Sequence, residues 1–112
     1  MKSAQAISAL SALAQETRLD VFRHLMQHHP KGIPAGDLAA KFGVPASTMS
    51  AHLAILTRAG LTSPARDGRT IYYAAEIDGI RELLSFLVKD CCNGKPNACN
   101  RLLDAALSSC CP

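Results

Sequence analysis

Residues 35–61 read AGDLAAKFGVPASTMSAHLAILTRAGL. The first part predicts a short helix over residues 37–42, which Gly43 ends, because glycine readily takes the left-handed conformation found just after a helix. A second helix is expected to begin around Pro45, since proline is tolerated at the first helical position, and to stop at Gly60. Two helices joined by a turn of about three or four residues that contains glycine form a helix-turn-helix.

The residues after this unit change from a helical to an extended pattern. Residues 61–66 and 69–74 form two short extended segments around the dipeptide Asp67-Gly68. Asp-Gly between two such segments predicts a β-hairpin, because a two-residue turn needs positive φ angles. Pro64 confines the first strand to the edge of a sheet. A helix-turn-helix followed directly by a two-stranded hairpin has the element order of a winged helix.

Two further helices are expected before the helix-turn-helix. In the first, apolar side chains recur at every third position from Ile7 to Leu13. The second is expected to open at Thr17, because Asp20 three residues later completes a pattern that resembles a capping box. It should end before Pro30, which opposes continuation of a helix.

A wide apolar stripe marks a fifth helix after the hairpin. Its members are Ile77, Ile80, Leu84 and Leu87, with Leu83 and Val88 beside them. A small domain buries a limited fraction of its surface, so we expect this stripe to pair with a second copy of the chain. The alternative is that it only closes the core of the monomer. The expected fold class is mainly α with a small β-hairpin, a winged helix-turn-helix that is dimeric.

Length and charge narrow the class of protein. The 112 residues suffice for one compact fold, and no segment approaches the ~20 apolar residues of a membrane helix. No signal peptide is recognisable, so a cytoplasmic protein without membrane contact is expected. Residues 31–73 hold five basic and two acidic side chains, a difference of +3 that equals the net charge of the whole chain. This excess is either a solvated basic surface or the contact surface for an acidic partner.

The cysteines are confined to one end of the chain. All five lie in the last 22 residues: Cys91, Cys92, Cys99, Cys110 and Cys111. An odd, clustered set does not fit a disulfide scaffold and indicates soft-metal binding or redox chemistry. We therefore expect a winged-helix and dimerisation domain over residues 1–90 and a cysteine-rich segment over residues 91–112, with a last short helix over residues 97–107.

Three segments carry a resemblance to a known family. They are LAQETRL at residues 13–19, GVPASTMSAHLAIL at 43–56 with RAGL at 58–61, and GRTIYY at 68–73. In these segments the chain resembles the ArsR/SmtB family of metal-responsive winged-helix repressors. Two positions depart from the family pattern: Pro45 stands where serine is frequent, and Ala51 where many members have a basic residue.

The second helix of the helix-turn-helix has a composition that suits DNA recognition. Small and polar side chains there can approach bases or phosphates in the major groove, and arginines on the wing can meet phosphates or the minor groove. The predicted contact residues are Ser47, Thr48, Ser50, His52, Arg58, Arg66 and Arg69. Without the hairpin, the preferred interpretation would be that the serines and threonine only cover an exposed helix surface. A dimer would recognise an inverted repeat in double-stranded operator DNA.

The resemblance also indicates which ligand would release the repressor from DNA, that is, its inducer. Arsenic-sensing members commonly carry Cys-x-Cys on the first helix of the helix-turn-helix, and zinc-sensing members use His and Asp on the last long helix. Residues 35–38 contain no cysteine here, and residues 76–90 contain no histidine. Some relatives instead carry a Cys-Cys pair, a Gly/Pro turn and a third cysteine for arsenite, which Cys91, Cys92 and Cys99 match.

These observations predict a repressor whose inducer is trivalent arsenic or antimony, with no catalytic cofactor. Three thiolates suit a three-coordinate soft ion, whereas zinc prefers four ligands. Cys110 and Cys111 are possible further ligands, so zinc, cadmium or lead stays open, as does a thiol redox switch. An enzyme such as an arsenate reductase is not expected, because it would need an anion-cradling loop and no cysteine here is followed by arginine six positions later. His24 and His28, four residues apart, are interpreted as a solvent-exposed pair rather than a metal site.

Overall fold

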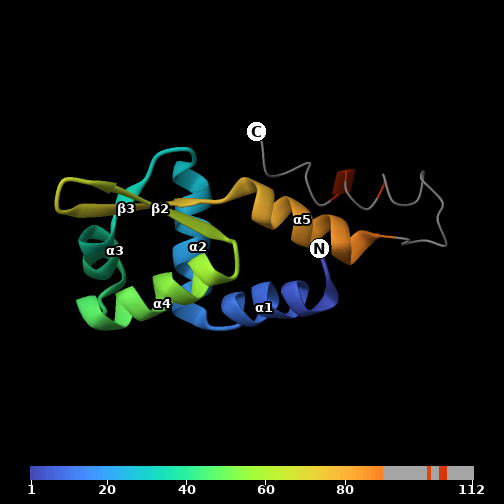
Figure 1. Cartoon of the computed structure of the whole chain (residues 1–112), viewed down its shortest axis with the longest axis horizontal. Coiled ribbons are helices and arrows are strands. Elements are labelled where there is room, and N and C mark those ends of the chain that lie inside the picture. The colour runs from blue at the N-terminus through green and yellow to red at the C-terminus, as the bar shows by residue number, and fades with distance from the viewer. Residues whose placement is uncertain (90–100, 102–103, 106–112) are drawn as a thin grey trace.

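The computed structural model describes residues 1–89, 101 and 104–105 (Figure 1). Its helices are α1 Ser3–Leu13, α2 Glu16–His28, α3 Ala35–Phe42, α4 Ala46–Arg58 and α5 Ile77–Val88. Its strands are β1 Ile33–Pro34, β2 Thr62–Asp67 and β3 Thr70–Ala75. The predicted order of a helix-turn-helix, a hairpin and a following helix is confirmed.

The sheet has one strand more than the sequence predicts. It is antiparallel with the order β1-β3-β2, and Ile33 and Pro34 of β1 pair with Tyr73 and Tyr72 of β3. The predicted β2–β3 hairpin is present, but β1 was missed, because a two-residue strand is too short to show an alternating pattern. Pro64 lies on β2, which is an edge strand as predicted.

The hairpin turn lies one residue later than expected. Asp67 pairs with Thr70, so the two-residue loop is Gly68-Arg69 rather than Asp67-Gly68. Gly68 occupies the first loop position with φ 64°. Because glycine takes a positive φ without steric cost, the register of the hairpin follows the glycine and leaves Asp67 in the strand.

Two helix starts also differ from the predictions. Helix α2 begins at Glu16, and the side chain of Gln15 accepts a hydrogen bond of 2.9 Å from the backbone N–H of Arg18. Thr17 therefore lies inside the helix and is not its cap. Pro45 precedes α4 as its extended N-cap residue and is not its first helical residue. Gly43 ends α3 in the left-handed conformation, φ 63°, as predicted.

A single core joins the helices to the sheet. The buried apolar residues are Ala6, Ala9, Ala12, Val21, Phe22, Leu25, Leu38, Ala39, Met49, Leu53, Leu56, Leu61, Ala75 and Leu83. Alanines let α1 pack closely on its neighbours, and leucines from α2, α3 and α4 fill the centre. Thr62 is buried too, and its hydroxyl shares a hydrogen bond of 2.9 Å with Thr57, so this polar group is satisfied.

The elements are divided between two ends of an elongated molecule (Figure 1). Helices α3 and α4 and the β2–β3 hairpin lie at one end, α1 and α5 lie at the other, and α2 lies between them. None of the described helices is long and apolar enough to cross a membrane. The predicted helix over residues 97–107 lies outside the described residues, except that Arg101, Asp104 and Ala105 are helical.

Candidate nucleic-acid interface

Helix α4 has a buried face and an exposed face of small and polar side chains. Met49, Leu53 and Leu56 face the core. On the opposite side, Ser47 and Arg58 are exposed with two alanines between them, a spacing that keeps all four side chains on one stripe of a 3.6-residue helix. The small alanines leave the backbone of α4 accessible, so the helix can lie close to the bases in a groove of nucleic acid.

The remaining predicted residues of α4 lie on its two flanks. Ser50 is exposed on the flank of Thr57, whose hydroxyl bonds to Thr62 at the start of the wing. Thr48 and His52 are one turn apart on the other flank, where His52 is half-buried. The structure therefore presents all five predicted α4 side chains at or near one surface, with Ser47 and Arg58 most central.

His52 has a neighbour that sequence reasoning missed. Nη1 of Arg18, on α2, lies 3.5 Å from Nδ1 of His52. The same guanidinium donates from Nε to the carbonyl oxygen of Ala12 at 2.7 Å and from Nη2 to that of Ser11 at 3.4 Å. Arg18 was noted only as part of the segment of family resemblance. A sequence separation of 34 residues from His52 carries no local pattern that would have shown the contact.

The wing supplies the other predicted cations. Arg69 lies in the turn of the hairpin, Arg66 lies on β2 opposite Ile71, and both arginines are exposed. A hollow of about 410 Å³ separates the base of the turn from the start of α3; it is lined by Pro34, Ala35, Gly36, Arg69, Thr70 and Ile71. The hairpin and the helix-turn-helix therefore border the same end of the molecule (Figure 1).

Among the described residues, the arginines of this end have no carboxylate partners. In the part of the chain that the structure describes, the single ion pair joins Arg81 to Asp78 on α5 at 3.1 Å. Arg58, Arg66 and Arg69 form no ion pair with any residue that the structure describes. Unneutralised arginines on an exposed surface are available to phosphates, and releasing the counterions of DNA would favour that contact.

The predicted cysteine site lies outside the described residues. This holds for Cys91, Cys92, Cys99, Cys110 and Cys111 alike. Within the residues that the structure does describe, no three His, Cys, Asp or Glu side chains gather closely enough to hold a metal ion.

The histidine pair on α2 lies away from this surface. Nδ1 of His28 donates to the carbonyl oxygen of His24 at 2.9 Å, and the two ring centroids are 4.4 Å apart. His28 is exposed as predicted, but His24 is half-buried and packs edge-on against Phe42 of α3. Burial, together with the positive charges of His28 and Lys41, lowers the pKa of His24 below 6.5.

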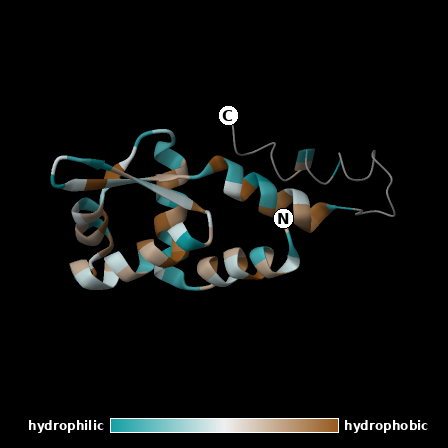
Figure 2. Cartoon of the chain, viewed as in Figure 1, coloured by the Kyte–Doolittle hydropathy of each residue, from teal (hydrophilic) through white to brown (hydrophobic). Residues whose placement is uncertain are grey.

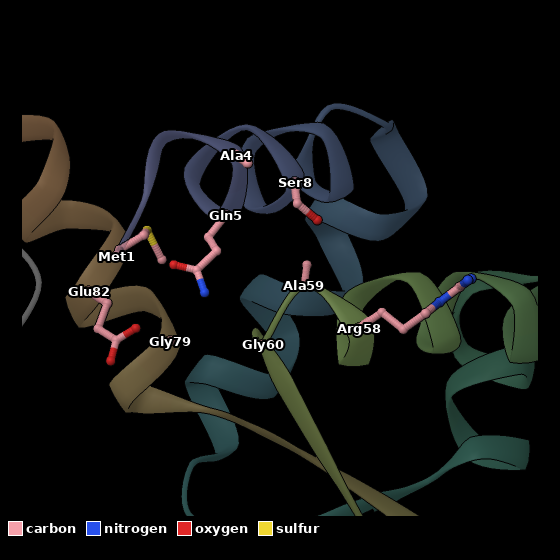
Figure 3. Close-up of a pocket in the computed structure, with 9 residues that line it drawn as sticks. All are labelled: Met1, Ala4, Gln5, Ser8, Arg58, Ala59, Gly60, Gly79 and Glu82. Carbon is pink, nitrogen blue, oxygen red and sulfur yellow. The ribbon is translucent and has the colours of Figure 1, made fainter.

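A second hollow lies where α1 and α5 meet the end of α4. It measures about 460 Å³ and is lined by Met1, Ala4, Gln5, Ser8, Arg58, Ala59, Gly60, Gly79 and Glu82 (Figure 3). The side chains of Gln5 and Glu82 face it from opposite sides, whereas Arg58 extends away along α4. Its lining holds one carboxylate and one hydroxyl, that of Ser8, but no histidine or cysteine, so it does not resemble an active site.

Gly79 brings the backbone of α5 onto the turn that follows α4. A Cβ at this position would collide with the carbonyl oxygen of Gly60. One residue before α5, the N–H of Glu76 donates to the carbonyl oxygen of Leu61 at 2.9 Å. Helix α5 is therefore held directly against the segment between α4 and the wing, with no side chain between the two backbones at the closest point.

Comparisons with known proteins agree with this geometry. The sequence model of a helix-turn-helix domain family matches residues 13–63. The chain is 28% identical to the transcriptional activator HlyU of Vibrio cholerae over 76% of each chain. Two solved structures are also similar. One, a possible transcriptional regulator for arsenical resistance, is 32% identical with a TM-score of 0.64, covering 71% of this chain and 80% of that one.

The other solved structure is the homodimeric winged helix-turn-helix DNA-binding domain of Mb0332 from Mycobacterium bovis, a possible ArsR-family transcriptional regulator. It is 28% identical with a TM-score of 0.63, covering 76% of this chain and 77% of that one. The fold, the recognition helix and the wing define a winged helix-turn-helix protein of the class that regulates transcription. The chain belongs to the ArsR family of these transcriptional regulators.

Proposed function

We propose that the protein is a dimeric repressor that binds an inverted repeat in double-stranded DNA and releases it when trivalent arsenic or antimony binds its C-terminal cysteines. The observation that carries DNA binding is the shared surface of α4 and the wing, where Arg58, Arg66 and Arg69 are exposed without carboxylate partners among the described residues. Serine and alanine side chains between these cations allow close approach to base edges.

A dimer is supported by the apolar side chains at the other end of the molecule. Ile7 and Leu10 of α1 are 66% and 43% exposed, and Leu84 and Leu87 of α5 are 48% and 51% exposed. The teal-to-brown colouring of Figure 2 shows apolar residues along α5, away from the wing. Covering these side chains with a second copy would remove them from water. The similar domain from Mycobacterium bovis is a homodimer.

The inducer is inferred from the cysteine pattern. Cys91 and Cys92 follow α5 directly in the sequence, and Cys99 comes after a short segment that contains glycine and proline. Three thiolates match the coordination of trivalent arsenic or antimony. The second pair, Cys110 and Cys111, would permit the four-coordinate binding that zinc or cadmium prefers.

The contact between α5 and the end of α4 offers a route for coupling. Any change in the direction of α5 on metalloid binding would act on Gly60 through Gly79 and on Leu61 through the hydrogen bond from Glu76. Since Leu61 connects the recognition helix to the wing, the spacing of two recognition helices in a dimer would change. A coupling free energy of roughly 1–3 kcal/mol weakens DNA binding by about 5- to 150-fold.

The test is a release titration on a duplex selected from a random pool by the reduced protein. Fluorescence anisotropy would follow release with arsenite, antimonite, zinc, cadmium, lead and peroxide added separately. We expect the wild type to release DNA with arsenite or antimonite. The double variant C91S/C92S should bind the same duplex and not respond, whereas the matched variant C110S/C111S should still respond.

Each other outcome contradicts a defined part of the proposal. Failure of the reduced protein to select any duplex would refute DNA binding. Release by zinc, cadmium or lead alone would assign a four-coordinate metal as inducer, and release by peroxide alone would assign a redox switch. Loss of DNA binding in C91S/C92S would make those cysteines structural. Because the similar HlyU is an activator, transcription in a reconstituted system should be measured as well; stimulation by the protein would exclude repression.

A further inference from the structure

Arg18 is held in one orientation by backbone groups. Its side chain reaches back over the end of α1, where Nε donates to Ala12 at 2.7 Å and Nη2 to Ser11 at 3.4 Å, both through carbonyl oxygens. These carbonyls lie in the last turn of α1, where the partial negative charge of a helix favours a cation. Two bonds to a planar guanidinium fix its plane, so the direction of the third nitrogen, Nη1, is fixed as well.

Nη1 faces the recognition helix. It lies 3.5 Å from Nδ1 of His52, and both side chains are half-buried. Arginine is always protonated in proteins and has no acceptor, so the contact is favourable only if Nδ1 carries a lone pair. A neutral imidazole with a lone pair on Nδ1 carries its hydrogen on Nε2.

We propose that Arg18 is a positioning residue that holds His52 as the tautomer with hydrogen on Nε2, so that this N–H donates a hydrogen bond to an acceptor on DNA. The inference rests on the proposed function, since it assumes that α4 contacts DNA. The flank that carries His52 also carries exposed Thr48 one turn earlier, so His52 lies at the edge of the proposed interface.

The acceptor is an oxygen or nitrogen atom with a free lone pair. A phosphate oxygen has this chemistry, and so do N7 of purines, O6 of guanine and O4 of thymine in the major groove. The two kinds of acceptor can be distinguished by sequence specificity. A hydrogen bond to a phosphate strengthens binding to all DNA sequences, whereas a hydrogen bond to a base strengthens binding to one sequence.

The tautomer can be measured without any variant. Long-range ¹H–¹⁵N correlation spectra of the free wild-type protein at pH 8 report which ring nitrogen of His52 is protonated. We expect Nε2–H in the wild type and a mixture of tautomers in Arg18→Lys, because a lysine cannot bond to two carbonyls and an imidazole in one plane. The matched control Arg23→Lys alters an exposed arginine of the same helix and should leave the His52 signals unchanged. A wild-type ring protonated on Nδ1 would overturn the proposal.

DNA binding tests the role of the donor. The terminal amide of glutamine can place an N–H near the position of Nε2, whereas that of asparagine is too short. We expect His52→Gln to keep affinity within about threefold of wild type and His52→Asn to lose about tenfold or more, which is ~1.4 kcal/mol. Equal affinity of wild type and His52→Asn would refute the inference and leave the proposed function intact, whereas a wild type that binds no duplex would refute the proposed function itself.

Duplexes substituted one base pair at a time then distinguish the two acceptors. A uniform loss across all duplexes for His52→Asn assigns a phosphate oxygen, and a loss confined to one base pair assigns a base. Both results support the donor role.

Discussion

The two ends of the molecule are built from opposite kinds of surface. At the end formed by α3, α4 and the hairpin, the exposed side chains over the leucine core are small or polar. They include serine, threonine, alanine and arginine, together with Lys41 and the carboxylates of Asp37 and Asp67. At the end formed by α1 and α5, large apolar side chains are exposed. Among the described residues, the exposed large hydrophobic side chains are Met1, Ile7, Leu10, Leu19, Leu84 and Leu87, and none lies between α2 and the last turns of α5.

This difference assigns separate physical tasks to the two ends. A surface of small polar groups and arginine side chains gains little free energy when water is excluded from it. It gains much more when the arginines contact phosphates. A surface of leucine and isoleucine gains by being covered, and large exposed apolar patches mark interaction sites. The backbone contact between Gly79 and Gly60 joins the two ends, so what covers one end can affect the other.

The largest effect is expected from breaking the apolar end. The double variant Leu84→Glu/Leu87→Glu places two charges on exposed positions of α5, so the monomer should fold while the dimer is lost. With only one recognition helix per molecule, affinity for the selected duplex should fall about 100-fold or more, or ~2.7 kcal/mol. Light scattering measures the mass of the particle in solution, and fluorescence anisotropy measures its affinity for the duplex. Ser85→Glu, on the polar side of α5, is the control and should remain dimeric; an unchanged mass in the double variant would argue against this interface.

The joint between the two ends is the next target. Gly79→Ala places a Cβ against the carbonyl oxygen of Gly60, so α5 must shift, and overpacking of this kind costs about 1–3 kcal/mol. Urea unfolding should show a correspondingly lower midpoint. Gly36→Ala is a matched control on α3, since nothing lies within 4 Å of its Cβ position, and it should stabilise the protein by about 0.4–1 kcal/mol. Equal stability of the two variants would show that the Gly79 contact is not tight.

A smaller effect is expected at the cationic end. Arg69→Ala removes one exposed cation from each wing, so a dimer loses two phosphate contacts and affinity should fall by about tenfold. The slope of log K against log salt should become shallower by about 1.8, from ~0.9 per contact. Titrations at several salt concentrations measure this slope. Arg81→Ala, on α5 and paired with Asp78, is the control; an equal slope in both variants would remove Arg69 from the interface.

The smallest effect is expected from His24, which lies between the two ends. Its pKa is lowered in the folded protein, mainly by burial, so the unfolded chain takes up the proton first as the pH falls below 6.5. The stability linked to neutral His24 is thus complete above pH 6.5 and is lost as the pH falls through the lowered pKa of His24. Melting temperatures between pH 7.5 and 5 should fall less in His24→Gln than in wild type. A steeper fall in the variant would contradict this origin.

The sequence predicted those secondary-structure elements that are set by residues close together along the chain. Gly43 and Gly60 mark the ends of the two helices of the helix-turn-helix, and the apolar stripe of α5 is visible from Ile77 to Leu87. Each of these signals depends on residues a few positions apart along the chain. The edge position of β2 follows from the single missing N–H of Pro64. The exposure of Ser47, Thr48, Ser50 and Arg58 on α4 was also predictable, since exposure on a helix follows from its period. Their contact with DNA stays a prediction.

The amino-acid order by itself thus determined the succession of helices and strands, the position of the recognition helix and the cations of the wing. Only the tertiary structure decided that β1 joins the sheet, that α5 rests on Gly60 through Gly79, and that Arg18 meets His52. Each of these contacts joins backbone or side-chain groups at least 19 residues apart, as with positions 60 and 79. Such contacts depend on how the whole chain packs, and that free energy is shared among many residues and leaves no local pattern.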